Sequence, residues 1–184
     1  QHPAPVPASG RPRIVYVLRD AAHNLYLGWD DPHYYRSRAF ALVTQIIDVL
    51  ARHAARYEII IRCSEPMLGR ELIETCLHDR GACGITCDTR RPFTRLLRDS
   101  ALVVVDWPST PLFEAVTMGV PMTTFCAIGV QPQAEALLRA ATSWHTGLTG
   151  FLTALDTQLQ TGEFAEPAGA AAFRRDMLSL PGDG

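Results

Sequence analysis

The sequence predicts an α/β fold: a Rossmann-like parallel sheet of five to six strands with helices on both faces. Short apolar runs rich in Val, Ile and Thr alternate five times with segments whose apolar residues recur at helical spacing. The connections between them are mostly short, which is typical of parallel strands joined by helices. A chain of 184 residues is long enough for one domain with a substantial core.

Each predicted strand is a continuous apolar run, as expected where a parallel sheet is buried on both faces. The five runs are RIVYVL (13–18), YEIIIRC (57–63), GITCDT (84–89), ALVVVD (101–106) and PMTTFCAI (121–128). Helices are predicted where apolar residues recur every three or four positions. They are expected near 40–54, 67–80, 93–100, 111–119, 131–142 and 148–159, with one more short helix around 170–178.

The two ends of the chain differ in composition from its middle. Residues 1–12 are rich in Pro and Ala and are interpreted as a linker, as expected for a domain taken from a longer protein. Residues 13–160 are assigned to the Rossmann-like domain. Residues 161–184 are rich in Gly, Ala and Pro and are predicted to form a weakly structured tail.

The overall composition argues against several classes of function. The formal net charge of -2 and the pI of about 6.3 give no basic surface for nucleic acid. No apolar run reaches the roughly 18 to 20 residues of a transmembrane helix. All 17 basic residues are Arg and none is Lys, so a P-loop lysine is excluded. A phosphate-binding cation must therefore be an Arg or a backbone amide.

The five cysteines have irregular spacing and contain no C-x-x-C pair. Cys76, Cys83 and Cys87 could form a zinc site with His78, but free and mostly buried thiols in a reducing compartment fit this spacing better. We therefore expect no metal, no other cofactor and a cytoplasmic location.

The loop after the fourth strand begins a helix with clear local signals. In an open parallel sheet a ligand lies at the carboxyl ends of the strands, so such loops are the places to look for function. Ser109 or Thr110 is the expected N-cap, Pro111 occupies the first turn, and Gly119 ends the helix. An ordinary capped helix accounts for all of these residues.

Glu114 and the second hydroxyl go beyond what a capped helix needs. A capping box requires an acid three residues after the cap, whereas Glu114 follows Thr110 by four residues and Ser109 by five. Glu114 is therefore predicted on the same helix face as Thr110, one turn further along. Free amides, two hydroxyls and a carboxylate would suit phosphate oxygens and a ribose. A nucleotide site and a simple helix start both remain open at this point.

The segment DWPSTPLFEAVTMGVP (106–121) resembles the donor-binding motif S/T-x-x-x-E-A-x-x-x-G-x-P of the C-terminal half of GT-B-fold glycosyltransferases. It looks most like transferases of bacterial surface carbohydrates, with some similarity to the glycerophosphotransferases of teichoic-acid synthesis. The resemblance implies that Ser109 and Thr110 contact the donor diphosphate and that Glu114 binds the ribose. Many relatives carry a Lys or a His-Pro pair after the second strand, where this chain has Arg62 as the substitute cation.

Further candidates lie on the other strand-to-helix loops. Arg19, after the first strand, is a candidate diphosphate cation, or alternatively pairs with a nearby Asp. Thr89 and the two arginines after it follow the third strand, where the resemblance places the nucleobase; alternatively, the two arginines are a solvated pair before a helix that starts at a proline. Gln131 and Gln133 follow the fifth strand and are candidate contacts to sugar or acceptor hydroxyls, or simply part of a helix start.

Together these features suggest the donor-binding half of a glycosyltransferase that transfers a sugar from a nucleotide-sugar to a carbohydrate acceptor. The resemblance implies a partner N-terminal GT-B domain that would supply the general base, so no catalytic residue is assigned in this chain. It also implies a bacterial protein, cytoplasmic and peripheral to the inner membrane. Two alternatives stay open: half of a sugar-nucleotide epimerase, and a non-catalytic Rossmann-like interaction module.

Overall fold

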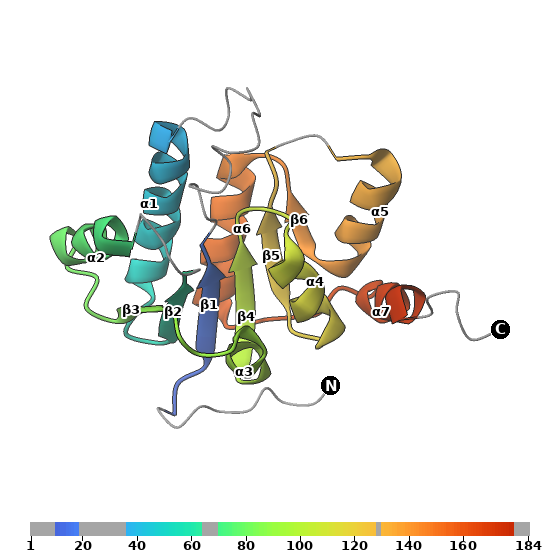
Figure 1. Cartoon of the computed structure of the whole chain (residues 1–184), viewed down its shortest axis with the longest axis horizontal. Helices are drawn as coiled ribbons and strands as arrows, with labels where there is room; N and C mark the ends of the chain where they lie inside the picture. The colour runs from blue at the N-terminus through green and yellow to red at the C-terminus, as the bar shows by residue number, and fades with distance from the viewer. Residues whose placement is uncertain (1–9, 19–35, 64–69, 128–129, 179–184) are drawn as a thin grey trace.

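One sheet of six parallel strands lies at the centre of the fold in the computed structural model, which describes residues 10–18, 36–63, 70–127 and 130–178 (Figure 1). The strand order is β3-β2-β1-β4-β5-β6, and every neighbouring pair is parallel. The strands are β1 Arg13–Val17, β2 Glu58–Arg62, β3 Ile85–Asp88, β4 Ser100–Val105, β5 Met122–Phe125 and β6 Ser143–His145. The predicted fold class is confirmed.

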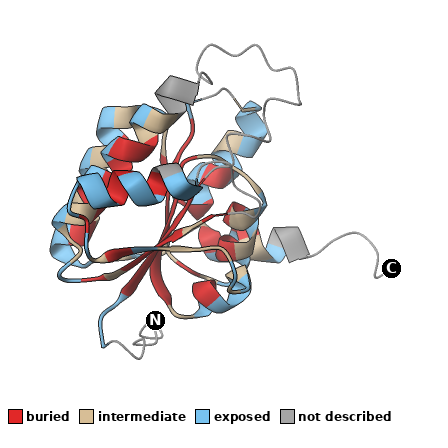
Figure 2. Ribbon diagram, turned by 60° about the vertical axis from the view of Figure 1, so that its left-hand side comes forward, coloured by how far each residue is buried: buried red, intermediate tan, exposed pale blue. Residues whose placement is uncertain are grey.

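Helices cover both faces of this sheet (Figures 1 and 2). One face is packed by α1 Arg36–Arg52, α2 Arg70–Asp79 and α6 Leu148–Thr161. The other is packed by α3 Phe93–Arg98, α4 Thr110–Thr117, α5 Pro132–Ala141 and α7 Ala170–Leu178. Each element agrees with a predicted segment except β6, a three-residue edge strand too short to show a periodic pattern.

The strands separate two hydrophobic clusters, one under each helical layer. In β1, Ile14 and Tyr16 belong to the cluster under α1 and α6, whereas Val15 and Val17 belong to the cluster under α4 and α5. All five residues of the strand are buried. This two-sided burial is the reason that the strands read as continuous apolar runs.

The strand order reverses between β1 and β4, which creates the topological switch point of the sheet. From β1 the chain moves outward to β2 and β3, and then returns to the opposite side of β1 as β4. The next helix along the chain after β1 is α1, on one face of the sheet, whereas β4 is followed by α4 on the opposite face. Folds of this kind bind ligands at such a point. The loop from β4 into α4 lies at this switch point.

The helix predicted within the C-terminal tail is present as α7, and it packs onto the domain. Ala170 is fully buried and Phe173 is buried in the α4–α5 layer. Arg174 Nη1 donates a hydrogen bond to the Val116 carbonyl at 3.2 Å, near the end of α4, and the same guanidinium pairs with Glu166. The sequence predicted the helix but not this packing, because the flanking Gly, Ala and Pro residues indicate a loose tail.

Candidate functional site

The N-terminus of α4 lies at the carboxyl edge of the sheet and carries the two predicted hydroxyls. Ser109 is the N-cap, with extended backbone angles (φ -137°, ψ 179°), and its carbonyl accepts a hydrogen bond from Leu112 N at 2.9 Å. Its side chain makes no capping hydrogen bond. Thr110, the first helical residue, is exposed and Ser109 is half-buried. The structure thus resolves which residue caps the helix and leaves the Ser109 hydroxyl available to a ligand.

The C-terminus of α4 follows the predicted pattern closely. Gly119 has φ +72°, a left-handed conformation that glycine adopts without steric cost. Its N–H donates to the Val116 carbonyl and Val120 N–H donates to the Ala115 carbonyl, both at 3.1 Å. These two bonds form a Schellman motif, in which the last carbonyls of a helix are satisfied. Gly119 is therefore explained by helix termination, without reference to a ligand.

Glu114 lies one turn into α4 and is half-buried. Its carboxylate forms no hydrogen bond or ion pair with any residue that the structure describes. A capping role would require a bond to the backbone amides of the first turn, and no such bond is present among the described residues. The carboxylate is thus available to a ligand resting on the helix start.

A buried carboxylate that the motif did not single out precedes this loop. Asp106 follows β4 directly and is 4% exposed. Its Oδ2 accepts a hydrogen bond from the fully buried Tyr16 hydroxyl of β1 at 2.8 Å. This bond joins the two strands that flank the switch point, and therefore steadies the start of the β4–α4 loop. The abrupt end of the apolar run at Asp106 was the sequence signal for it.

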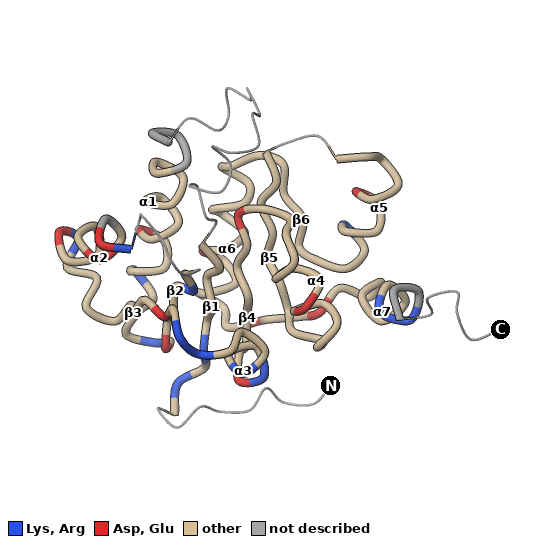
Figure 3. Tube along the Cα trace, in the orientation of Figure 1, with Lys and Arg blue, Asp and Glu red and all other residues tan. Residues whose placement is uncertain are grey.

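Two predicted residues, Arg62 and Thr89, lie together at the ends of β2 and β3. Arg62 Nη1 donates to the Asp88 carbonyl at 3.2 Å and lies 3.6 Å from Asp88 Oδ1, so this guanidinium already has a protein partner. Thr89 is half-buried in the turn that follows. Figure 3 shows the basic segment between β3 and α3 that contains Arg90 and Arg91. Whether Arg62 and Thr89 contact a nucleotide stays a prediction.

Cys63 and Cys87 lie beside this cluster on neighbouring strand ends. A hydrogen bond with Cys87, together with burial, raises the pKa of the Cys63 thiol, and the same bond lowers the pKa of Cys87. All five cysteines are free. Within the described ranges no group of three or more His, Cys, Asp or Glu side chains is placed to hold a metal ion.

Several candidates stand apart from the α4 start. Arg19 lies outside the described residues, so its predicted role stays a prediction. Gln131 is the N-cap of α5 without a side-chain capping bond, and Gln133 is exposed on the same helix. Neither contributes to the β4–α4 loop in the contacts of the described chain.

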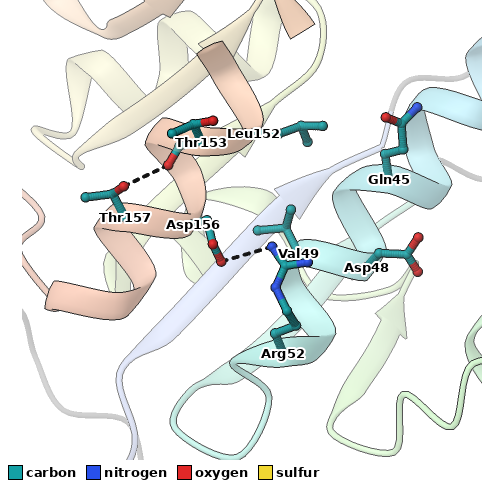
Figure 4. Close-up of a pocket in the computed structure, with 8 residues that line it drawn as sticks. All are labelled: Gln45, Asp48, Val49, Arg52, Leu152, Thr153, Asp156 and Thr157. Atoms are coloured by element: carbon teal, nitrogen blue, oxygen red, sulfur yellow. Dashed lines mark hydrogen bonds and ion pairs between the residues drawn. The ribbon is translucent and has the colours of Figure 1, made fainter. Parts of the chain in front are cut away.

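A separate groove lies between α1 and α6, away from the strand-to-helix loops (Figure 4). Its volume is about 390 Å³, and Arg52 pairs across it with Asp156 at 3.1 Å. His53 also bonds Asp156, at 2.8 Å, and these partners keep the pKa of this carboxyl below its usual value despite the opposing effect of burial. The charged groups that line the groove are already in ion pairs, Arg52 with Asp156 and Asp48 with Arg80.

No protein-family model and no curated protein matches this sequence. Solved structures match the fold. The spinosyn rhamnosyltransferase SpnG complexed with thymidine diphosphate has a TM-score of 0.62 at 16% identity, over 96% of this chain and 45% of that chain. S. aureus TarM, in a complex that includes UDP, has a TM-score of 0.62 at 13% identity, over 98% of this chain and 35% of that one.

A Listeria monocytogenes protein described as a UDP-N-acetylglucosamine 2-epimerase has a TM-score of 0.50 at 15% identity, over 92% of this chain and 43% of that chain. The chain spans less than half the length of each of these proteins. The domain is therefore similar in fold to one half of GT-B glycosyltransferases. No described helix is both long enough and apolar enough to span a bilayer.

Proposed function

We propose that this chain is the donor-binding half of a glycosyltransferase and that it binds a nucleotide-sugar at the start of α4. One observation carries the proposal: at this helix start the Ser109 hydroxyl is not used for capping, and Glu114 has no partner among the described residues. A helix that needed only stable ends would engage the hydroxyl of its cap, since that interaction stabilises a helix by about 1 kcal/mol.

Each group has a role that follows from its chemistry. The N-terminal amides of α4 and its dipole favour the negative diphosphate, and the Ser109 and Thr110 hydroxyls donate to its oxygens. Glu114 accepts hydrogen bonds from the ribose hydroxyls, as the resemblance to the donor-binding motif implies. Such fixed donors would also stabilise the nucleoside diphosphate as it leaves, which is where negative charge develops during glycosyl transfer.

Transfer itself is proposed to need a second domain. This chain covers 45% of SpnG and 35% of TarM, so more than half of a whole transferase of that kind would lie outside this chain. The other half would supply the carbohydrate acceptor site and the general base. The isolated chain should accordingly bind a donor but transfer its sugar poorly. A bacterial surface-carbohydrate acceptor and a cytoplasmic location at the inner membrane are the finer parts of this proposal.

Two other functions remain compatible with the fold. The likeness to an epimerase at a TM-score of 0.50 supports a nucleotide-sugar ligand with a different reaction. A non-catalytic module would keep the fold without the ligand. Titration with free nucleotides distinguishes the non-catalytic module from the transferase and the epimerase, because both enzymes must bind the nucleotide part of their substrate.

Calorimetric titration of the chain with UDP, TDP, CMP, CDP and GDP tests the proposal. We expect one nucleoside diphosphate to bind with a Kd in the micromolar to submillimolar range, about 5–8 kcal/mol of binding free energy. The same nucleotide should bind more weakly once Ser109 and Thr110 are both replaced by Ala. Absence of binding by every nucleotide up to millimolar concentration would favour the non-catalytic module.

A further inference from the structure

The ends of β2 and β3 are joined by a network centred on the Asp88 carboxylate, which no sequence motif indicated. Its Oδ1 accepts hydrogen bonds from the backbone N–H groups of Arg90 at 3.0 Å and Arg91 at 2.9 Å. Its Oδ2 accepts one from Arg91 Nε. The Asp88 side chain is only 11% exposed. One carboxylate thus holds the 89–91 turn and an arginine side chain in place.

The same residue holds Arg62 across the gap between the two strands. Arg62 Nη1 lies 3.2 Å from the Asp88 carbonyl and 3.6 Å from Oδ1. The neighbouring Cys63 N–H also donates to the Asp88 carbonyl, at 3.0 Å, which extends the β2–β3 pairing by one residue. These contacts anchor Arg62 through a single nitrogen. Its remaining N–H groups make no hydrogen bond to a described residue in the structure.

The position of this network matches the reach of a nucleotide bound at α4. In the sheet, β2 is separated from β4 by β1 alone. With about 4.8 Å between neighbouring strands, their carboxyl ends lie roughly 10 Å apart. An extended nucleoside diphosphate has about this length, so a donor whose diphosphate rests on α4 could extend over the end of β2.

We propose that Asp88 is a positioning residue of the nucleotide site, which orients the Arg62 guanidinium toward a donor bound at the start of α4. This inference rests on the proposed function and adds Asp88 to it. Pre-orientation matters because an arginine that is already held loses less side-chain freedom when a ligand binds. The carboxylate acts through Arg62 and has no contact with the ligand itself.

The charge of Asp88 persists under assay conditions. Burial favours its neutral form, but the Arg91 side chain and the two backbone N–H groups outweigh burial and lower the pKa of this carboxyl below its usual value. The ion pair therefore remains intact from pH 5 to pH 8, and nucleotide affinity in this range should not follow the titration of Asp88.

A double-mutant cycle tests whether Asp88 acts through Arg62. The nucleotide that binds the wild-type chain most tightly among UDP, TDP, CMP, CDP and GDP is titrated into Asp88→Ala, Arg62→Gln and the double variant. We expect each single variant to bind about five- to tenfold more weakly. We expect the double variant to bind no more weakly than Arg62→Gln, because the two residues form one unit.

A second variant distinguishes the effect of Asp88 on the 89–91 turn from the effect of its charge on Arg62. It also keeps the test valid if Asp88→Ala unfolds. Asp88→Asn retains an oxygen that can accept from the Arg90 and Arg91 amides, but it removes the negative charge that lies 3.6 Å from Arg62 Nη1. It should fold normally and still weaken binding. Asp156→Asn is the matched control, since it removes a similarly paired carboxylate between α1 and α6. This control should leave affinity unchanged.

The possible outcomes distinguish the inference from the proposed function. Nucleotide binding that is unaffected by Asp88→Asn or Arg62→Gln, yet lost with the Ser109 and Thr110 substitutions, would overturn the role of Asp88 and keep the α4 site. Additive losses in the cycle would show that Asp88 does not act through Arg62. A wild-type chain that binds no nucleotide would refute both proposals.

Discussion

The replacement Glu114→Gln tests the proposed donor site most directly, because the change is isosteric and removes only the charge. In the structure the carboxylate has no partner among the described residues, so the free protein should lose little when it is neutralised. A ribose hydroxyl bound to a charged acceptor is worth about 1.5–3 kcal/mol, and its loss corresponds to roughly 10- to 150-fold weaker binding. Surface changes of this kind alter folding stability by about 0.5 kcal/mol, or roughly 1–2 °C in Tm for a chain of this size.

The assay pairs calorimetric titration with thermal melting of the same samples. Glu135→Gln is the matched control, since Glu135 lies in the first turn of helix α5 and forms an exposed i,i+4 pair with Arg139. We expect the control to bind nucleotide as the wild type does. An analogue lacking both the 2′- and 3′-hydroxyls should bind wild type and Glu114→Gln equally weakly, because the ribose contact is then absent from both complexes.

One result would refute this reasoning. If Glu114→Gln binds the nucleotide with unchanged affinity while its Tm falls by several degrees, the carboxylate serves the helix and not a ligand. If Glu114→Gln also binds the analogue more weakly than the wild type does, and by the same factor as for the nucleotide itself, Glu114 contacts some part of the nucleotide other than the ribose hydroxyls.

Three further predictions concern stability, measured by denaturant unfolding, and a fourth concerns pH. Arg13→Met should lower the free energy of unfolding by about 1–3 kcal/mol, because two partly exposed carboxylates lose a largely buried guanidinium that pairs with them at 3.1 and 3.2 Å; a loss below about 0.5 kcal/mol would contradict this. Gly119→Ala should cost about 1–2 kcal/mol because φ is +72°, and an unchanged midpoint would show that the turn relaxes. Phe173→Ala should lower the free energy of unfolding by about 3–5 kcal/mol, because Phe173 is buried in the core. The control Phe113→Ala, at an exposed position, should change it little. Equal small losses for both variants would show that α7 does not unfold together with the rest of the domain. Because the folded-state pKa of Asp88 is lowered, its contribution to the free energy of unfolding is complete above the unfolded pKa near 4 and is lost as pH falls through the folded value. Asp88→Asn should therefore lose less stability than the wild type as the pH is lowered through this range. An identical loss of stability in both proteins would show that Asp88 is not the titrating group.

The sequence predicted the sheet well because burial on both faces gives continuous apolar runs. Val103 and Val104 face opposite helical layers, yet both are fully buried, so neither position shows a polar alternation. The edge strand β6 was missed because Ser143, Trp144 and His145 are too few to form a pattern. Its pairing with β5 depends on tertiary contacts.

The candidate site was only partly predictable. The i+4 spacing of Thr110 and Glu114 singled out the acid because helical geometry alone relates the two positions. That Ser109 is the cap, and that its hydroxyl makes no capping bond, is decided by the folded structure. Arg62 was predicted as a phosphate-binding cation, but its partner Asp88 was not predicted, because it lies 26 residues further along the chain.

Local chemistry therefore determined the order of strands and helices, the ends of α4 and the residue types at its start. These features depend on hydrophobic periodicity, proline, glycine and spacing within one helical turn, all of which act between near neighbours. The tertiary structure decided which groups are already occupied: Arg62 by Asp88, Asp106 by Tyr16 and the end of α4 by Arg174. Such pairings form between residues distant in sequence, because only the packing of separate strands and helices brings their side chains within hydrogen-bonding distance.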